Sequence, residues 1–252
     1  MLRIILSFFG GVFTFLTMSV VAFALTIGAV FWIYGRDLPS HESLAQYKPP
    51  TISRIYSGEG RIVDEFARER RLFTGAKDVP ILIKQAFISA EDKNFYSHPG
   101  YDLRGILSAA VDAARSGGRR VRGASTITQQ VMKNFLLDGS RRAERKIKEI
   151  ILATRIENTL DKERILELYL NEIFLGQNSY GVTAAAQTYF NKTLDELAPH
   201  EAAFLASLPK APSDFHPVRR KQRLLDRRNY VLKEMWQNGF LEEAAYRAEA
   251  AQ

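Results

Sequence analysis

An uncharged apolar segment near the N-terminus constrains the fold of this 252-residue chain more than any other feature. Residues 4–35 contain no Asp, Glu, Lys or Arg. A helix of about 20 apolar residues crosses a bilayer core, so this segment is long enough to span with some tilt. Arg3 precedes it, and Arg36 and Asp37 follow it. This charge distribution favours an N-terminus in the cytoplasm and a body on the outer face of the membrane.

A cleaved signal peptide is the alternative interpretation of the same segment, because residues 22–24 read Ala-Phe-Ala, a small-residue cleavage pattern. The apolar run before them is longer than a usual signal core, and apolar sequence continues to Trp32. We therefore predict an uncleaved signal anchor with a cytoplasmic tip over residues 1–35.

The rest of the chain divides into a short linking region and a helical domain. Pro39, Pro49 and Pro50 interrupt the first part, and a strand–turn–strand pattern surrounds residues 57–60, so we predict a linker and a small β hairpin over 36–75. The domain at 76–252 is helical in pattern, which makes the fold class mainly α with a small β element. The predicted helices span residues 80–91, 103–116, 125–137, 141–160, 162–172, 180–188, 194–208, 219–238 and 240–250.

Residue usage excludes several kinds of site. The chain has no cysteine, which excludes a disulfide framework and a thiolate metal site. His200 and Glu201 begin like a zinc-protease helix, but the second histidine of that motif is missing.

Positive charge is concentrated in one segment. Residues 115–148 contain ten Lys or Arg and two Asp or Glu, a net +8, whereas the whole chain carries +7. Such a focus attracts phosphate, nucleic acid or anionic lipid head groups. The membrane anchor favours a lipid-linked phosphate, and the base-stacking aromatic residues of a single-strand binder are absent from the segment, so we predict no nucleic-acid partner.

Two carboxylates are expected in contrasting environments. Glu91 ends the apolar helix 80–91, and burial there raises a carboxyl pKa. Glu149 shares one helix face with Arg142, Arg145 and Lys146, whose charges keep it ionised. Two carboxylates held in different environments are the arrangement that glycosyl chemistry needs.

Five motifs occur in order along the chain, and together they resemble the peptidoglycan glycosyltransferases (transglycosylases). That family forms the membrane-proximal domain of class A penicillin-binding proteins and also occurs as monofunctional enzymes. The motifs are Glu91-Asp92-x-x-Phe95-x-x-His98-x-Gly100, the run Gly123 to Gln130 (GASTITQQ), Arg145-Lys146-x-x-Glu149, the run Lys162 to Asn171 (KERILELYLN), and Arg227-Arg228-x-x-Val231-Leu232.

The resemblance implies a lysozyme-like glycosyltransferase domain that polymerises lipid II into β-1,4 glycan strands, with inversion and release of undecaprenyl diphosphate. In that family Glu91 would be the general base. Glu149 would be the second essential glutamate, orienting the donor or diphosphate with or without a divalent cation (Mg²⁺ or Mn²⁺). No motif requires a cofactor. The residues implied to bind diphosphate or sugar are Lys133, Arg145, Lys146, Arg141, Ser125, Gln129 and Gln130.

Other motif residues have an open role between substrate contact and turn-capping or packing. They are Asp92, Phe95, His98, Gly100, Thr126, Glu167 and Asn171. We expect Glu167 and Asn171 to brace the core or the wall of the cleft. The two arginines of the fifth motif are interpreted as structural. Residues 116–122 are expected to form a mobile loop.

We predict that the chain is the N-terminal part of a bifunctional class A penicillin-binding protein, and three alternatives remain. Ser207-x-x-Lys210 imitates a transpeptidase nucleophile, but Pro209 interrupts it and no Lys-Thr-Gly follows, so we predict that the transpeptidase domain of a class A protein is absent here. The alternatives are a natural monofunctional transglycosylase, a membrane-anchored lysozyme-like hydrolase, and a non-catalytic module that binds anionic lipid. The predicted partners are lipid II, the lipid-linked growing strand, the bilayer of the bacterial cytoplasmic membrane and other cell-wall synthesis proteins.

Overall fold

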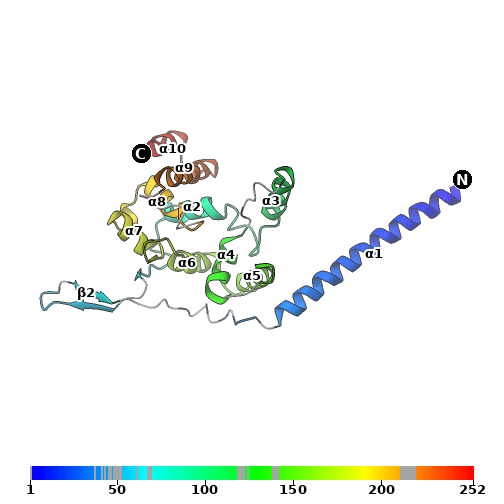
Figure 1. The fold of residues 1–252 in the computed structure, drawn as a ribbon, viewed down its shortest axis with the longest axis horizontal. Coiled ribbons are helices and arrows are strands. Elements are labelled where there is room, and N and C mark those ends of the chain that lie inside the picture. The colour runs from blue at the N-terminus through cyan, green and yellow to red at the C-terminus, as the bar shows by residue number, and fades with distance from the viewer. Residues whose placement is uncertain are drawn as a thin grey trace.

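The computed structural model describes residues 2–36, 38–40, 42, 44, 47, 53–60, 62–66, 70–117, 123, 125–137, 142–210 and 220–252. Helices dominate this part of the chain (Figure 1), as the sequence predicts. The prediction of a mainly α fold with a small β element is therefore confirmed.

The first helix, α1 (Leu2–Gly35), extends away from the body of the molecule (Figure 1). Its segment Ser7–Gly35 has a mean hydropathy of 2.1, and its most apolar part is not buried by the rest of the protein. The segment is therefore long and apolar enough to cross a membrane. At its end the Arg36 guanidinium lies 4.2 Å from the centre of the Trp32 ring. The base of α1 contacts α5 (Arg142–Glu157), where the Arg155 guanidinium donates a 3.0 Å hydrogen bond to the Gly35 carbonyl.

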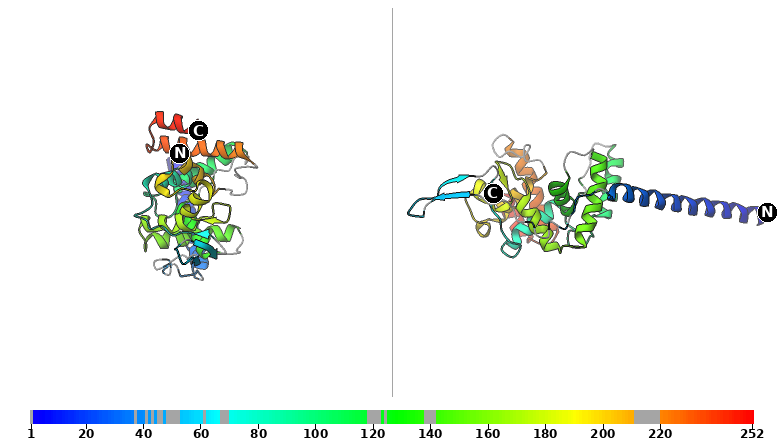
Figure 2. Two further views of the ribbon diagram at one scale, coloured as in Figure 1. Left: turned by 90° about the vertical axis from the view of Figure 1, so that its left-hand side faces the viewer. Right: turned by 90° about the horizontal axis from the view of Figure 1, so that it is seen from below.

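The predicted strand–turn–strand is an antiparallel hairpin of β1 (Ser53–Tyr56) and β2 (Ile62–Phe66). Gly60 closes its turn with a positive φ of 79° and donates its amide to the Ser57 carbonyl at 2.9 Å. The hairpin projects from the side of the body opposite α1, as Figures 1 and 2 both show. The patterns did not predict a second, parallel pair, formed by β3 (Arg70–Arg71) and β4 (Ser179–Tyr180).

Two groups of helices share one hydrophobic core. In the first, α2 (Ile81–Glu91) packs against α8 (Pro199–Ser207) and α9 (Lys221–Gln237), and α10 (Glu243–Ala250) covers α9. In the second, α4 (Ile127–Leu136) packs against α5 and α6 (Lys162–Glu172). The helix α7 (Val182–Phe190) contacts β4, α6 and α8. The core includes Phe87, Leu152, Tyr169, Leu205 and Met235.

The helix predicted at 194–208 is wrong in one respect, because the chain breaks it in two. A 3₁₀ turn, η2 (Leu194–Glu196), ends at Leu197, and α8 begins at Pro199. Ala198 precedes the proline and is extended (ψ 161°), since the proline ring disfavours the helical conformation of the residue before it. Proline then suits the first helical position.

The helix α3 (Leu103–Arg115) is amphipathic in sequence but is largely uncovered. Ala109 is its buried residue, whereas Leu103, Leu107 and Val111 are exposed at spacings of four residues along one face. In Figure 1 α3 lies on the side of the body that faces α1.

Candidate functional site

Glu91 lines a cavity of about 490 Å³. The end of α2, the start of α3, the segment that leads into α4, and α9 all contribute to its walls. Of the predicted site residues, the cavity brings together Glu91, Asp92, Ser125, Thr126 and Gln130. Four parts of the fold therefore meet around this cavity.

The Glu91 carboxylate is held in a mostly buried setting. Its side chain is 13% exposed. One oxygen, Oε2, accepts a 3.0 Å hydrogen bond from the Gln130 amide, whereas Oε1 has no hydrogen bond. Burial raises the pKa of Glu91, and the Gln130 bond and the charges of Arg227 and Lys210 oppose that rise without cancelling it. The predicted rise in the pKa of this carboxyl is confirmed.

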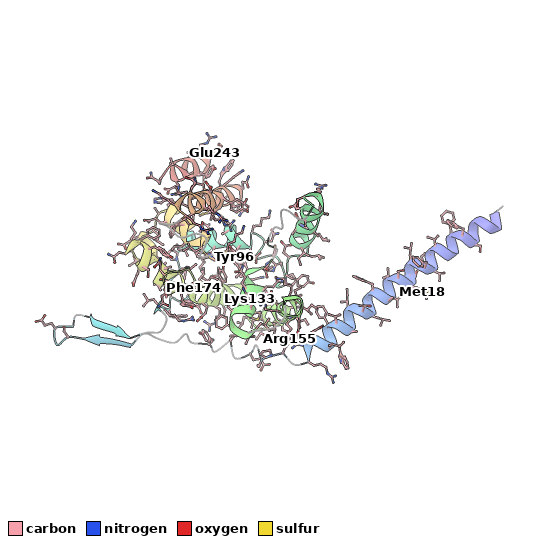
Figure 3. The ribbon with its side chains drawn as sticks, viewed as in Figure 1. Met18, Tyr96, Lys133, Arg155, Phe174 and Glu243 are labelled. Carbon is pink, nitrogen blue, oxygen red and sulfur yellow. The ribbon has the colours of Figure 1, made fainter. Side chains whose placement is uncertain are left out.

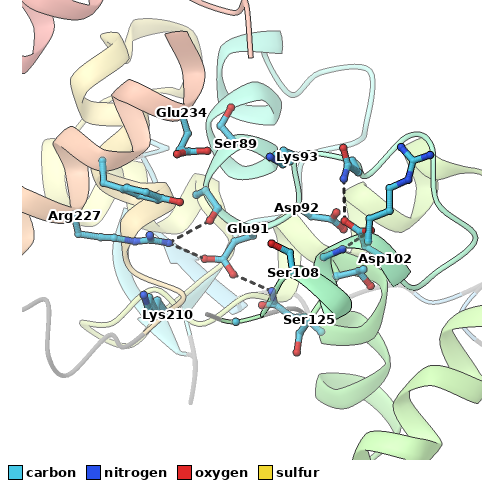
Figure 4. A pocket seen from close by; sticks show the side chains of 18 residues that line it. Ser89, Glu91, Asp92, Lys93, Asp102, Ser108, Ser125, Lys210, Arg227 and Glu234 are labelled. Atoms are coloured by element: carbon cyan, nitrogen blue, oxygen red, sulfur yellow. Dashed lines mark hydrogen bonds and ion pairs between the residues drawn. The ribbon is translucent and has the colours of Figure 1, made fainter. Parts of the chain in front are cut away.

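Two cations beside Glu91 are functional candidates that the sequence interpretation missed. The Arg227 Nη2 atom lies 3.5 Å from Glu91 Oε1, and Lys210 also lines the cavity (Figure 4). Burial lowers the pKa of Lys210, followed by the nearby charge of Arg227. Arg227 also donates a 3.2 Å hydrogen bond to the Ala90 carbonyl, a contact that agrees with the interpretation of the fifth-motif arginines as structural, and a further role at Glu91 stays untested. The same interpretation agrees with Arg228, which is buried and donates to Asn229 and to the Ala250 carbonyl.

A second polar cluster is built around Lys146, close to the first. Its ammonium donates to Ser125 Oγ at 2.7 Å, to Gln129 Oε1 at 2.9 Å and to Glu149 Oε2 at 3.1 Å. Arg145 Nε lies 3.5 Å from the other oxygen of Glu149, a residue that is 5% exposed. Ser125 also lines the Glu91 cavity, so it joins the two clusters.

The remaining predicted cations are placed as follows. Lys133, labelled in Figure 3, is exposed in the last turn of α4, one turn beyond Gln130. It is not among the residues that line the Glu91 cavity. Arg141, the Arg142 side chain and residues 118–122 lie outside the described residues, so the predictions made for them stay open. The expected pairing of Glu149 with cations is confirmed for Arg145 and Lys146.

Several motif residues of open role form a framework that holds α2 and α4 together. The buried Asp92 carboxylate accepts from the Ile127 amide at 2.9 Å and contacts His98 Nε2 at 2.9 Å. The Gly100 amide donates to His98 Nδ1 at 3.1 Å. Thr126 caps α4 and donates its hydroxyl to the Gly100 carbonyl at 2.7 Å. These bonds fix the N-terminus of α4 beside Glu91, and Phe95 is fully buried next to them.

The fourth-motif residues brace the region that precedes α2. Asn171 exchanges two hydrogen bonds with the backbone of Thr74, at 2.8 and 2.9 Å. Glu167 accepts from the Ala76 amide at 2.6 Å and pairs with Arg164. These contacts agree with the predicted bracing role of Glu167 and Asn171.

No ready-made metal centre is visible in the part of the chain that the structure describes, where no three His, Asp or Glu side chains are grouped to hold an ion. Glu149, the predicted metal ligand, faces Arg145 and Lys146. The role of a divalent cation at Glu149 stays a prediction.

Comparisons with known proteins agree in one family. A family model described as Transglycosylase matches residues 59–236. Penicillin-binding protein 1A of Rickettsia prowazekii (strain Madrid E) is 47% identical over 234 residues, which are 90% of this chain and 30% of that protein. Penicillin-binding protein 1A of Aquifex aeolicus (strain VF5) is 42% identical over 228 residues, which are 90% of this chain and 31% of that protein. The chain thus spans less than a third of the length of these curated relatives.

Among solved structures, the 2.6 Å crystal structure of penicillin-binding protein 1A from Haemophilus influenzae shares 28% sequence identity. It covers 82% of this chain and 21% of its own, with a TM-score of 0.45.

Proposed function

The chain belongs to the transglycosylase family, and from that premise we propose that it polymerises lipid II into β-1,4 glycan strands and releases undecaprenyl diphosphate. The observation that carries the proposal is the buried Glu91 carboxyl with its raised pKa, facing a cavity beside a separate cationic cluster. Glycosyl transfer from a diphosphate needs both, a base for the incoming hydroxyl and cations for the leaving group.

In the proposed reaction Glu91 is the general base. It takes the proton of the acceptor sugar's 4-hydroxyl as that oxygen forms a bond to the anomeric carbon of the growing strand. The bond from the anomeric carbon to the diphosphate oxygen breaks, and the α-linkage inverts to β. A base is most effective when its pKa lies near the working pH, and the burial of Glu91 moves its pKa in that direction.

The diphosphate that leaves carries the developing negative charge. We assign its stabilisation to Arg145 and Lys146, with Lys133 as a further clamp. Glu149 would hold Arg145 and Lys146 in place through the two ion pairs described above. The Ser125 hydroxyl and the Gln129 and Gln130 amides would orient sugar and phosphate oxygens between the two clusters.

The membrane geometry supports a lipid-linked substrate. We propose that α1 anchors the chain in the bacterial cytoplasmic membrane, with the body on its outer face. The exposed apolar face of α3, on the side of the body toward α1, suits contact with the same bilayer. An enzyme and a substrate held on one surface meet at a high effective concentration.

The test is polymerisation of labelled lipid II in detergent, read as glycan ladders on a gel. The wild-type chain is compared with Glu91→Gln and with the control Glu243→Gln, which changes an exposed glutamate on α10 that pairs with Arg247. Ladders from the wild type and the control, and none from Glu91→Gln, are expected. Full activity of Glu91→Gln would refute the base assignment, and cleavage of preformed glycan without polymer would indicate a hydrolase.

A further inference from the structure

Tyr169 on α6 is a buried phenol with no use in the site described above. Its side chain is 1% exposed, and its hydroxyl has no hydrogen-bond partner in the described part of the chain. Buried hydroxyls nearly always have a partner, because desolvating a polar group without replacing its bond to water costs stability. An unpaired hydroxyl at this depth therefore needs a physical explanation.

The position of Tyr169 links it to Glu91. Its ring packs edge-on against Phe87, with the ring centroids 6.1 Å apart and the planes at 75°. Phe87 and Glu91 are four residues apart on α2, so they lie on the same helix face one turn apart. Burial raises the pKa of the Tyr169 phenol, and the charges of Glu91 and then Asp92 raise it further.

Glu91, in turn, has a buried hydrogen-bond acceptor without a donor. Its Oε1 atom is buried and accepts no hydrogen bond, since the nearest cation, Arg227 Nη2, is 3.5 Å away. The unpaired hydroxyl thus belongs to a ring that packs against α2 one turn before the residue with the unpaired acceptor.

We propose that Tyr169 is a positioning residue for Glu91, whose hydroxyl donates a hydrogen bond to the Glu91 carboxylate when that group is ionised. This inference rests on the proposed role of Glu91 as the base. A hydroxyl can donate to a carboxylate and can accept from a carboxylic acid, so one side chain can serve Glu91 before and after it takes the acceptor proton. Donation to the charged form is the stronger of the two bonds, so the pairing favours the ionised base and aims it.

Other groups around Glu91 act on its charge as well, and a test must leave them in place. They are the Gln130 amide and the charges of Arg227, Lys210 and Asp92, while Tyr230 and Glu234 from α9 line the same cavity. Tyr169→Phe removes a neutral hydroxyl and keeps the ring against Phe87. A change in the ionisation of Glu91 in that variant would come from the lost pairing, because no charge is removed.

The experiment uses the full chain in detergent and compares Tyr169→Phe with Tyr189→Phe. Tyr189 is the matched control, because its hydroxyl donates a 2.8 Å bond to the Leu175 carbonyl and it does not line the Glu91 cavity. In Tyr169→Phe the acidic limb of the pH profile of kcat/KM should move to higher pH by about 0.5 to 1 unit, the size expected for one lost hydrogen bond. Tyr189→Phe should leave that limb unchanged.

A second readout does not depend on activity. The folded pKa of Glu91 is raised, so its contribution to stability is fully present below the unfolded pKa and is lost as the pH rises through the folded pKa. In Tyr169→Phe this loss should continue to higher pH by the same interval, measured as melting temperature against pH. The difference between the Tyr169→Phe variant and the unsubstituted chain should disappear when both carry Glu91→Gln.

The outcomes separate this inference from the proposed function. The pairing would be overturned if Tyr169→Phe left the pH profile of kcat/KM unchanged. It would also be overturned if Tyr169→Phe shifted the curve of melting temperature against pH equally in the Glu91→Gln background, or lowered the melting temperature equally at every pH. Failure of the proposed function would instead be full polymerisation by Glu91→Gln or no polymer from the wild type. The melting comparison still decides the pairing in that case.

Discussion

At the scale of single residues, Lys133 is the proposed diphosphate ligand that can be replaced with the least effect on the stability of the fold. It is exposed in the last turn of α4, so replacing it should change the free energy of unfolding by no more than about 0.5 kcal/mol. If it clamps the donor diphosphate, Lys133→Ala should lower polymerisation by at least about tenfold, the worth of one good charge-assisted bond. Lipid II polymerisation and thermal unfolding are measured side by side. Lys233→Ala, an exposed lysine on α9, is the control, and a collapse of melting temperature in Lys133→Ala alone would show a structural role instead.

The part of the site that could be predicted from the sequence is the part whose residues lie close together along the chain. Glu91 ends an apolar helix, and Lys146 and Glu149 are three residues apart on one helix, so their settings follow from local geometry. Arg227 and Lys210 could not be placed, because their approach to Glu91 depends on how α8 and α9 pack on α2. The available signals were the place of Arg227 in the fifth motif and the position of Lys210, three residues after the end of the apolar helix α8.

At the scale of elements, the join between the end of α2 and the start of α4 depends on Gly100. Its φ of 94° is unfavourable for other residues, and a Cβ there would lie 2.6 Å from the Ala153 carbonyl oxygen on α5. Gly100→Ala should therefore combine backbone strain with overpacking and cost about 3 kcal/mol or more. Gly239→Ala has a similar φ of 75° but open space at Cβ, so strain alone should cost about 1–2 kcal/mol. Chemical denaturation of both variants checks this, and equal losses would contradict the contact with α5.

Helix positions were predictable because apolar periodicity and capping residues act within one element. The exceptions have longer-range causes. The two-residue strands β3 and β4 are too short for a pattern and form because residues more than a hundred positions apart are brought together. The break before α8 was readable in principle, since Pro199 disfavours a helical Ala198, but the apolar run on either side concealed it.

At the scale of the whole molecule, the hairpin and α1 extend from opposite sides of the body (Figures 1 and 2), so their tips should report opposite sides of a membrane. The chain has no cysteine, which makes single introduced thiols specific probes. We choose Gly58→Cys in the hairpin turn, where a Cβ meets no other atom within 4 Å, and Ser7→Cys near the start of α1.

With an N-terminus in the cytoplasm, a membrane-impermeant maleimide added to spheroplasts should label Gly58→Cys and not Ser7→Cys. Mild permeabilisation should then expose Ser7→Cys, which controls for intrinsic reactivity. The reverse pattern would place the body on the cytoplasmic side, away from a substrate presented on the outer leaflet, and would remove the membrane argument for a lipid-linked donor. Labelling of Gly58→Cys with release of the body from the membrane fraction would indicate cleavage after residue 24, because an intact α1 keeps the two together.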